Sequence, residues 1–149
     1  MHTPPVETKN IFLADDDMDD RSLFKDALNG IDIQTQLNIS KDGEELMKNL
    51  EETVPPPPDI IFLDLNMPRK NGFECLKEIR ENHKFEKIPV VILSTSDNAE
   101  AINTTYLLGA NLFVRKPQSF GLLKRAIKMV LNKNLNEIIS KENYLLQVE

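Results

Sequence analysis

Short runs of apolar residues recur along the chain. Four of them are NIFLA at 10–14, IIFL at 60–63, VVIL at 90–93 and NLFV at 111–114. They are continuous rather than alternating and rich in β-branched residues, which is typical of strands buried on both faces of a parallel sheet. TQLNIS at 35–40 is a weaker candidate, more typical of an edge strand.

Between these runs, apolar residues recur at the helical period. The residues that share a face are Leu23, Phe24, Ala27 and Leu28; Leu46, Met47 and Leu50; Phe73, Leu76 and Ile79; and Leu122, Leu123, Ala126, Ile127 and Val130. The first three groups follow possible caps, which are Asp19 or Asp20, Asp42-Gly43 and Asn71-Gly72. The segment 97–108, which stops at Gly109, is predicted as a further helix with a C-terminal glycine.

Strand and helix thus alternate five times along the chain. This order predicts an α/β fold with right-handed crossovers, namely a doubly wound five-stranded parallel sheet with helices on both faces. In the flavodoxin-like strand order 2-1-3-4-5, ligands bind beyond the carboxyl ends of the strands, between the first and third. The residues at those strand ends are therefore the candidates for a functional site.

Composition narrows the class of protein. With 149 residues and 40% hydrophobic content, the chain fits one domain, which we expect at 9–131 after a flexible 1–8. The net charge of −6 and a pI near 5.0 disfavour direct nucleic-acid binding. A secretory signal and a run of membrane-spanning length are both absent, so no membrane contact and a cytoplasmic location are expected. The single Cys75 excludes an intramolecular disulfide and a multi-cysteine zinc site.

Acidic residues gather where the first and third strands end. Asp15 and Asp16 follow the first strand, and Asp64 follows the third. Three carboxylates in a partly desolvated cleft would repel one another unless a cation joined them. Oxygen ligands without His or Cys favour Mg²⁺ over zinc, and the backbone carbonyl of Asn66 would add another such ligand. The remaining acids of this stretch are expected only to cap or solvate the first helix: Asp17, Asp19 and Asp20.

The fourth and fifth strands end in groups that suit an anion. Ser94 and Thr95 follow the fourth strand, and Lys116 follows the fifth. A metal ion and a lysine would neutralise the oxygens of a phosphoryl group, and a hydroxyl would hydrogen-bond one of them. Asp64 would then be the in-line nucleophile, which predicts an aspartyl phosphate.

Four segments together resemble a known family, the receiver domains of two-component response regulators. They are DDD at 15–17, FLDLNMPRKNG at 62–72, ILSTS at 92–96 and GANLFVRKP at 109–117. The resemblance runs from about Lys9 to about Leu131. The segment ENHKFEKIP, and the few residues after Leu131, resemble the stand-alone, chemotaxis-regulator-like group that serves phytochrome-type histidine kinases.

The resemblance implies a donor and a site. A histidine kinase or a histidine phosphotransfer protein would supply the phosphoryl group to Asp64. The residues that the family would use are Asp15, Asp16, Asp64 and the carbonyl of Asn66 for Mg²⁺, and Ser94 and Lys116 beside the phosphoryl group. The bond between Lys116 and Pro117 is usually cis in such domains.

The resemblance also implies a switch. Phosphate on Asp64 would attract Ser94 and Lys116, and Phe113, at the family's aromatic switch position, would turn inward. Thr95 stands where the family often has a smaller residue. The face made by the fourth helix, fifth strand and fifth helix would change shape and signal to a downstream protein, and this face would also serve a possible homodimer.

Two other functions compete with this one. A phosphatase of the haloacid-dehalogenase type also uses a strand-end aspartate and Mg²⁺, but it needs a second Asp two residues later, where this chain has Asn66. A degenerate receiver that acts only as a scaffold would lack some phosphorylation residues, and none is missing here. The sequence therefore favours a phosphoacceptor switch over a turnover enzyme.

The extension 132–149 is too short for an output domain, so a stand-alone receiver is expected. Leu131, Leu135, Ile138 and Leu145 have spacing close to that of a coiled coil, which would extend the fifth helix and allow pairing. A disordered tail is the alternative, and the sequence leaves both open.

Overall fold

A computed structural model of the chain describes residues 7–96, 98–137 and 140–148. Its strands are β1 Lys9–Ala14, β2 Thr35–Ser40, β3 Ile60–Leu63, β4 Val90–Ser94 and β5 Leu112–Arg115. Its helices are α1 Met18–Asn29, α2 Gly43–Thr53, α3 Gly72–Glu81, α4 Ala99–Leu107 and α5 Phe120–Leu131, followed by the short 3₁₀ helix η1 Lys141–Asn143. All strand pairs are parallel and the order is β2-β1-β3-β4-β5, which confirms the predicted topology.

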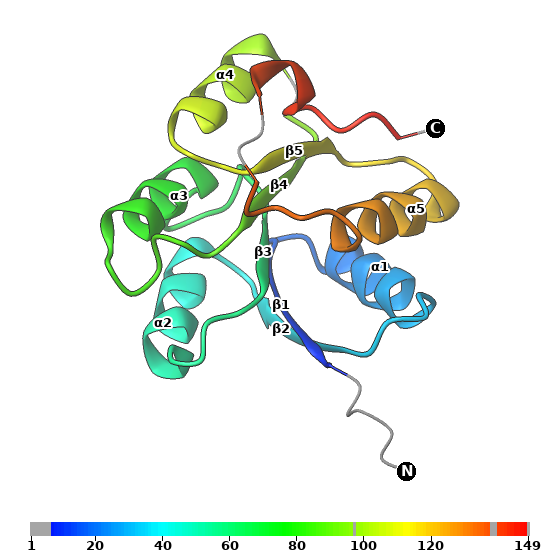
Figure 1. The fold of residues 1–149 in the computed structure, drawn as a ribbon, viewed down its shortest axis with the longest axis horizontal. Helices are drawn as coiled ribbons and strands as arrows, with labels where there is room; N and C mark the ends of the chain where they lie inside the picture. Colours follow the sequence, from blue (N-terminus) through cyan, green and yellow to red (C-terminus); the bar gives the residue numbers. More distant parts are fainter. Residues whose placement is uncertain (1–6, 97, 138–139, 149) are drawn as a thin grey trace.

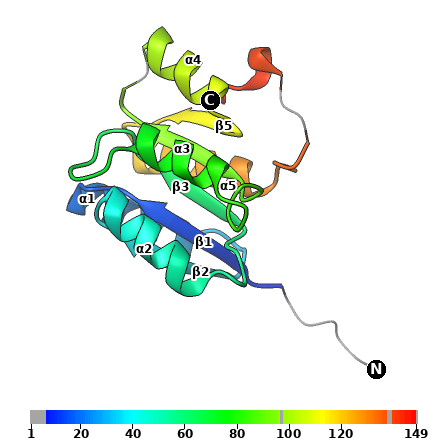
Figure 2. The same cartoon turned by 90° about the vertical axis from the view of Figure 1, so that its left-hand side faces the viewer.

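The sheet separates two layers of helices (Figures 1 and 2). Helices α1 and α5 cover one face, and α2, α3 and α4 cover the other. Successive strand residues point to opposite faces, so Phe12 faces α2 and α3 while Leu13 faces α1. Because β3 is buried on both faces, all four of its residues are apolar, as the continuous run predicted.

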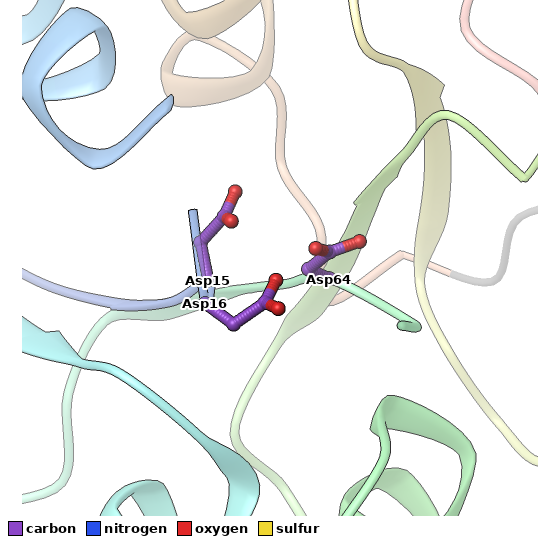
Figure 3. A group of neighbouring side chains, drawn as sticks. All are labelled: Asp15, Asp16 and Asp64. Atoms are coloured by element: carbon purple, nitrogen blue, oxygen red, sulfur yellow. The ribbon is translucent and has the colours of Figure 1, made fainter. Parts of the chain in front are cut away.

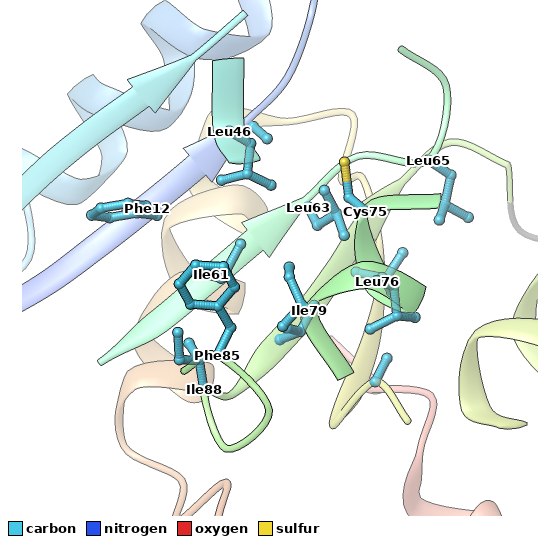
Figure 4. Close-up of a cluster of buried hydrophobic side chains, with 14 of the residues drawn as sticks. Phe12, Leu46, Ile61, Leu63, Leu65, Cys75, Leu76, Ile79, Phe85 and Ile88 are labelled. Atoms are coloured by element: carbon cyan, nitrogen blue, oxygen red, sulfur yellow. The ribbon is translucent and has the colours of Figure 1, made fainter. Parts of the chain in front are cut away.

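The core on the α2 and α3 side is built from the apolar stripe of each helix against the sheet. Figure 4 shows Leu46 of α2 and Leu76 and Ile79 of α3 next to strand residues Phe12 and Ile61. Cys75 of α3 lies in the same cluster, where burial raises the pKa of its thiol to about 12. It remains a protonated, apolar-like side chain at neutral pH.

Most helix boundaries follow from caps in the sequence. Asp42 caps α2, Asn71 forms a capping box on α3, and Gly109 ends the α4 segment with a φ of 98°. Of the three acids expected to cap or solvate α1, Asp19 and Asp20 do not cap it. Asp17 is the cap, because its extended backbone lets its side chain accept a hydrogen bond from the backbone N–H of Asp20 at 3.0 Å.

The C-terminal extension follows neither a continued helix nor a free tail in the part that the structure describes. Helix α5 ends at Leu131, and residues 140–148 fold back so that Leu145 forms a parallel bridge with Phe113 of β5. The chain thus returns to the sheet next to α4, as both views show. Ile138, which belonged to the predicted helical spacing, lies outside the described residues, as do residues 1–6 of the expected flexible terminus.

No helix in the described part of the chain combines the length and the apolar character that a membrane span requires.

Candidate functional site

The site begins with the register of β1 and β3. Ala14 pairs with Leu63, so the next residue of each strand, Asp15 and Asp64, emerges at the same edge of the sheet. Backbone hydrogen bonds hold both residues in place: Asp15 donates to the carbonyl of Ser40 at 3.1 Å, and Asp64 donates to that of Ala14 at 3.0 Å. The crossover connections therefore bring together two acids far apart in sequence.

Asp16 joins them. Asp15, Asp16 and Asp64 each offer a carboxylate oxygen, and these oxygens all lie within 4.8 Å of one another (Figure 3). Asp15 and Asp64 are only 2% and 5% exposed, whereas Asp16 faces solvent. The cluster is therefore shielded from solvent at Asp15 and Asp64 and open to solvent at Asp16.

Lys116 is the cation of this site. Its Nζ lies 2.8 Å from Oδ2 of Asp15 and 3.3 Å from Oδ2 of Asp64. Burial alone would lower the pKa of Lys116, but hydrogen bonds to Asp15 and Asp20 raise it above its ordinary value, so the ammonium keeps its proton. The expected cis bond between Lys116 and Pro117 is wrong: the cis bonds of the described residues are Val54–Pro55 and Pro55–Pro56.

Burial destabilises the charged forms of Asp15 and Asp64 in the folded protein. Desolvation raises the pKa of Asp64 to about 6, although the nearby Lys116 lowers it in part. The pKa of Asp15 is raised by the same cause and is also partly offset by Lys116. A carboxylate with a raised pKa in the folded state lacks a sufficient counter-charge.

A divalent cation fits this donor set. The three carboxylates are hard oxygen ligands with no His or Cys in their cluster, which suits Mg²⁺ or a similar ion. One lysine does not balance them, because its ammonium is shared with a further acid, Asp20. The backbone carbonyl of Asn66, expected as another ligand, belongs to the loop that follows Asp64.

This imbalance predicts how stability depends on pH in metal-free protein. Because the pKa of Asp64 is higher in the folded state, the folded state binds more protons between about pH 4 and about pH 6, and the free energy of unfolding falls as pH rises through that window. We expect an Asp64→Asn variant to be more stable than wild type at neutral pH, by on the order of 2 kcal/mol. Thermal denaturation in EDTA measures this difference.

Saturating Mg²⁺ should reverse the order, because a cation that binds only the folded wild type stabilises it. If Asp64→Asn and wild type had the same free energy of unfolding at every pH in EDTA, the desolvated carboxylate of Asp64 would not destabilise the folded protein, which would contradict this prediction.

Ser94 and Thr95, expected to respond to the phosphoryl group, lie at and just after the carboxyl end of β4. Ser94 is fully buried, and its hydroxyl accepts a hydrogen bond from the backbone N–H of Ser96 at 3.1 Å. Thr95 is exposed, and the side-chain amide of Asn66 donates to the hydroxyl of Ser96. Because the hydroxyl of Ser94 only accepts in its contact with the N–H of Ser96, its own O–H remains able to donate to a group on Asp64.

Phe113 already points into the core. It is fully buried in β5, and the centroid of its ring lies 6.2 Å from that of Tyr144 in an edge-on arrangement. The backbone N–H of Lys116, just after β5, donates to the carbonyl of Ser94 in the neighbouring strand β4 at 3.0 Å. The aromatic position, the lysine and the serine thus belong to one packed unit of β4 and β5.

One residue of the site was missed from the sequence. Asp20 was expected only to solvate the first helix, yet its Oδ2 lies 2.9 Å from Nζ of Lys116. Helix α1 places it there because the helix starts at Met18 and turns Asp20 toward the cleft, whereas Asp19 faces solvent. No local pattern separates the two acids, since the contact depends on how α1 packs against α5 and the sheet.

A matched pair of variants tests the contact. In Asp20→Asn, the ammonium of Lys116 has one acid fewer to neutralise and offsets the charges of Asp15 and Asp64 more completely. Because less negative charge is then left for a cation, Mg²⁺ should bind about fivefold more weakly. Asp19→Asn removes the same charge from the same helical turn without touching Lys116, and its affinity should stay close to that of wild type. Isothermal titration calorimetry gives both dissociation constants, and equal losses would show that only overall charge matters.

Known proteins share this fold and sequence. Residues 11–128 match the family model of the response regulator receiver domain. Response regulator Rcp1 of Synechocystis sp. is 36% identical over 126 residues, which cover 82% of this chain and 84% of that protein. The crystal structure of the phosphorylated cyanobacterial phytochrome response regulator RcpA superimposes with a TM-score of 0.77 at 34% identity, covering 83% of this chain and 91% of that chain.

A second solved structure is the Mn²⁺-bound form of Rcp1, with a TM-score of 0.76 and 32% identity over 88% of this chain and 97% of that chain. The sheet order, the acidic cluster at its edge and these matches agree with one another. The chain is a member of the response regulator receiver domain family of two-component signalling.

Proposed function

We propose that Asp64 accepts a phosphoryl group in an Mg²⁺-dependent reaction and that the protein signals through the resulting change of shape. The observation that carries this proposal is the position of Asp64. It shares a cluster with two more carboxylates and lies 3.3 Å from the ammonium of Lys116, at the open edge of the sheet. A nucleophile, a cation site and a fixed positive charge therefore converge on one point.

The residues divide the chemistry among them. Asp15, Asp16 and Asp64, with the carbonyl of Asn66, would hold Mg²⁺, which when bound neutralises charge on the phosphoryl oxygens. A carboxylate oxygen of Asp64 attacks phosphorus in line with the departing donor group. The ammonium of Lys116 pairs with the negative charge of the product, and the hydroxyl of Ser94, which accepts from the N–H of Ser96, donates to one of its oxygens.

The donor in this proposal is a histidine kinase or a histidine phosphotransfer protein. Similarity to Rcp1 and to RcpA, a cyanobacterial phytochrome response regulator, supports a phytochrome-type kinase as this donor, and a cytoplasmic location is part of the proposal. The output surface is the face of α4, β5 and α5, which would contact a downstream protein. Homodimer formation through that face or through the extension 132–149 stays a prediction.

The protein in this proposal is a switch and not a turnover enzyme. The matches are to receiver domains and give a phosphatase of the haloacid-dehalogenase type no support. Asn66 stands where such a phosphatase needs a second acid. A neutral amide cannot donate the proton that an ester leaving group requires.

Incubation with Mg²⁺ and a small acyl phosphate, followed by intact-mass measurement, tests the proposal. Wild type should gain one phosphoryl group, and EDTA added beforehand should prevent the gain. A parallel reaction with p-nitrophenyl phosphate should release no more product than buffer does. Steady turnover of that ester would favour the phosphatase, and an unmodified mass with acyl phosphate would contradict phosphorylation.

A further inference from the structure

The described C-terminal residues lie along the outer edge of the sheet. The backbone N–H of Phe113 donates to the carbonyl of Tyr144, and the N–H of Leu146 donates to the carbonyl of Phe113, both at 2.9 Å. Leu145 forms a parallel bridge with Phe113. Residues 141–146, which we term the C-terminal strap, thus satisfy backbone groups that the last strand of the sheet would otherwise expose.

Tyr144 anchors the strap. Its side chain is 1% exposed, and its hydroxyl donates to Oγ1 of Thr105 in α4 at 2.6 Å, a side chain that is itself fully buried. The ring also makes edge-on contacts with Tyr106 of α4, at 5.2 Å between centroids, and with Phe113 of β5. One residue therefore joins the strap to both a helix and a strand of the sheet.

The contacts are those of a bound peptide. Directly after η1, the strap adds two main-chain hydrogen bonds and one isolated bridge to an edge strand, and one aromatic side chain is buried against a polar partner, which are features of sites that bind a peptide along a sheet edge. The residues before Tyr144 in the strap, and the residue just after the strap, are exposed: Lys141, Glu142, Asn143 and Gln147. The strap is held by its backbone, by Tyr144, and by the partly buried side chains of Leu145 and Leu146, which pack against the hydrophobic cores.

We infer that the surface between α4 and β5 is a docking site for a short, aromatic-bearing segment, and that the chain's own strap closes this site. A partner that reaches the same surface has to displace the strap. Its recognition element would be a short segment whose backbone hydrogen-bonds to Phe113 and whose aromatic hydroxyl lies against Thr105.

The strap also ties the output surface to the phosphorylation site, a step that rests on the proposed function. If Ser94 moves toward a phosphoryl group on Asp64, the loop that leads into α4 moves with it, and α4 is fastened to β5 through Thr105 and Tyr144. Movement of α4 then strains that hydrogen bond. Coupling between two sites is reciprocal. The free energy by which phosphorylation weakens binding of the strap therefore equals the free energy by which the bound strap disfavours phosphorylation.

Hydrogen exchange of full-length variants tests whether Tyr144 anchors the strap. In Tyr144→Ala, the amides of Phe113 and Leu146 should exchange about tenfold faster than in wild type, while those of β1 and β3 stay protected and show an intact fold. Tyr144→Phe, which loses only the hydroxyl, should give an intermediate rate, and the exposed Gln147→Ala should match wild type. Equal exchange in Tyr144→Ala and Gln147→Ala would overturn the inference.

A labelled peptide, SKENYLLQV, tests whether the surface is a docking site. It should bind full-length Tyr144→Ala, whose site is open, at least about tenfold more tightly than wild type, whose site is closed. The same peptide with Ala for its tyrosine should not bind either chain. Equal binding of the first peptide to both proteins, or to neither, would show that the surface is not a site closed by the strap.

Beryllium fluoride with Mg²⁺, a stable mimic of the phosphoryl group, tests the link to Asp64. Exchange of the Phe113 and Leu146 amides in wild type should rise about threefold or more when the mimic is bound. Intact-mass and fluorine resonance measurements show separately whether it binds. Bound mimic with unchanged exchange would overturn the link alone, whereas a mimic that does not bind would count against the proposed function and leave the exchange and peptide results standing.

Discussion

An Asp64→Ala variant is expected to gain no phosphoryl group under conditions in which wild type gains one. In the proposed function this carboxylate is the nucleophile, whereas the other two acids of the cluster, Asp15 and Asp16, serve only to hold Mg²⁺. Loss of the fold does not explain such a result, because desolvation of Asp64 raises its pKa and its charge destabilises the metal-free protein. Intact-mass measurement after treatment with acyl phosphate and Mg²⁺ gives the comparison.

Asp19→Ala is the matched control for this experiment. It removes an exposed carboxylate close to the site and should be modified as fully as wild type. A phosphoryl adduct on Asp64→Ala of the same extent as on the control would contradict the assignment of the acceptor.

A Gly72→Ala variant is expected to lose at least about 2 kcal/mol of stability, since overpacking against fixed backbone costs this much or more. A Cβ on Gly72 would lie 2.3 Å from the carbonyl oxygen of Asp64 and 2.8 Å from Cα of Leu65. Both neighbours are backbone atoms of the loop that carries the acceptor, so they cannot rotate away. Mg²⁺ affinity should fall as well, because any relief of the clash displaces Asp64.

Gly121→Ala provides the reference for Gly72→Ala. A Cβ on Gly121, in the first turn of α5, meets nothing within 4 Å, and the exchange should stabilise the protein by about 0.5 kcal/mol through lower entropy of the unfolded chain. Urea denaturation of both variants measures the two changes. If Gly72→Ala were as stable as Gly121→Ala, the close approach of α3 to Asp64 would not exist in solution.

Local patterns were sufficient to predict the sheet. Buried strands such as Ile60–Leu63 need apolar side chains on both faces, and the edge strand Thr35–Ser40, which is half exposed, shows the weaker pattern that its position requires. Alternation of strands and helices then fixes a parallel sheet, and the ends of neighbouring parallel strands meet. Asp15, Asp64 and Lys116 could therefore be brought together before any coordinates were known.

Long-range contacts of single side chains could not be predicted in the same way. Asp19 and Asp20 are equivalent in the sequence, and only the packing of α1 decides that Asp20 reaches Lys116. Tyr144 belongs to a short segment with no helical or strand period, and its burial depends on Thr105 and Phe113, which are distant in the chain. These features arise from tertiary structure and leave no periodic signal.

The central claim is that phosphorus becomes bonded to the carboxylate of Asp64. Reduction of the phosphorylated wild-type protein with borohydride converts an aspartyl phosphate to homoserine, and peptide mapping by mass spectrometry locates that residue. The account predicts homoserine at position 64, with none when Mg²⁺ is chelated before the acyl phosphate is added. Homoserine at another aspartate, or a phosphoryl adduct that borohydride leaves unchanged, would contradict it.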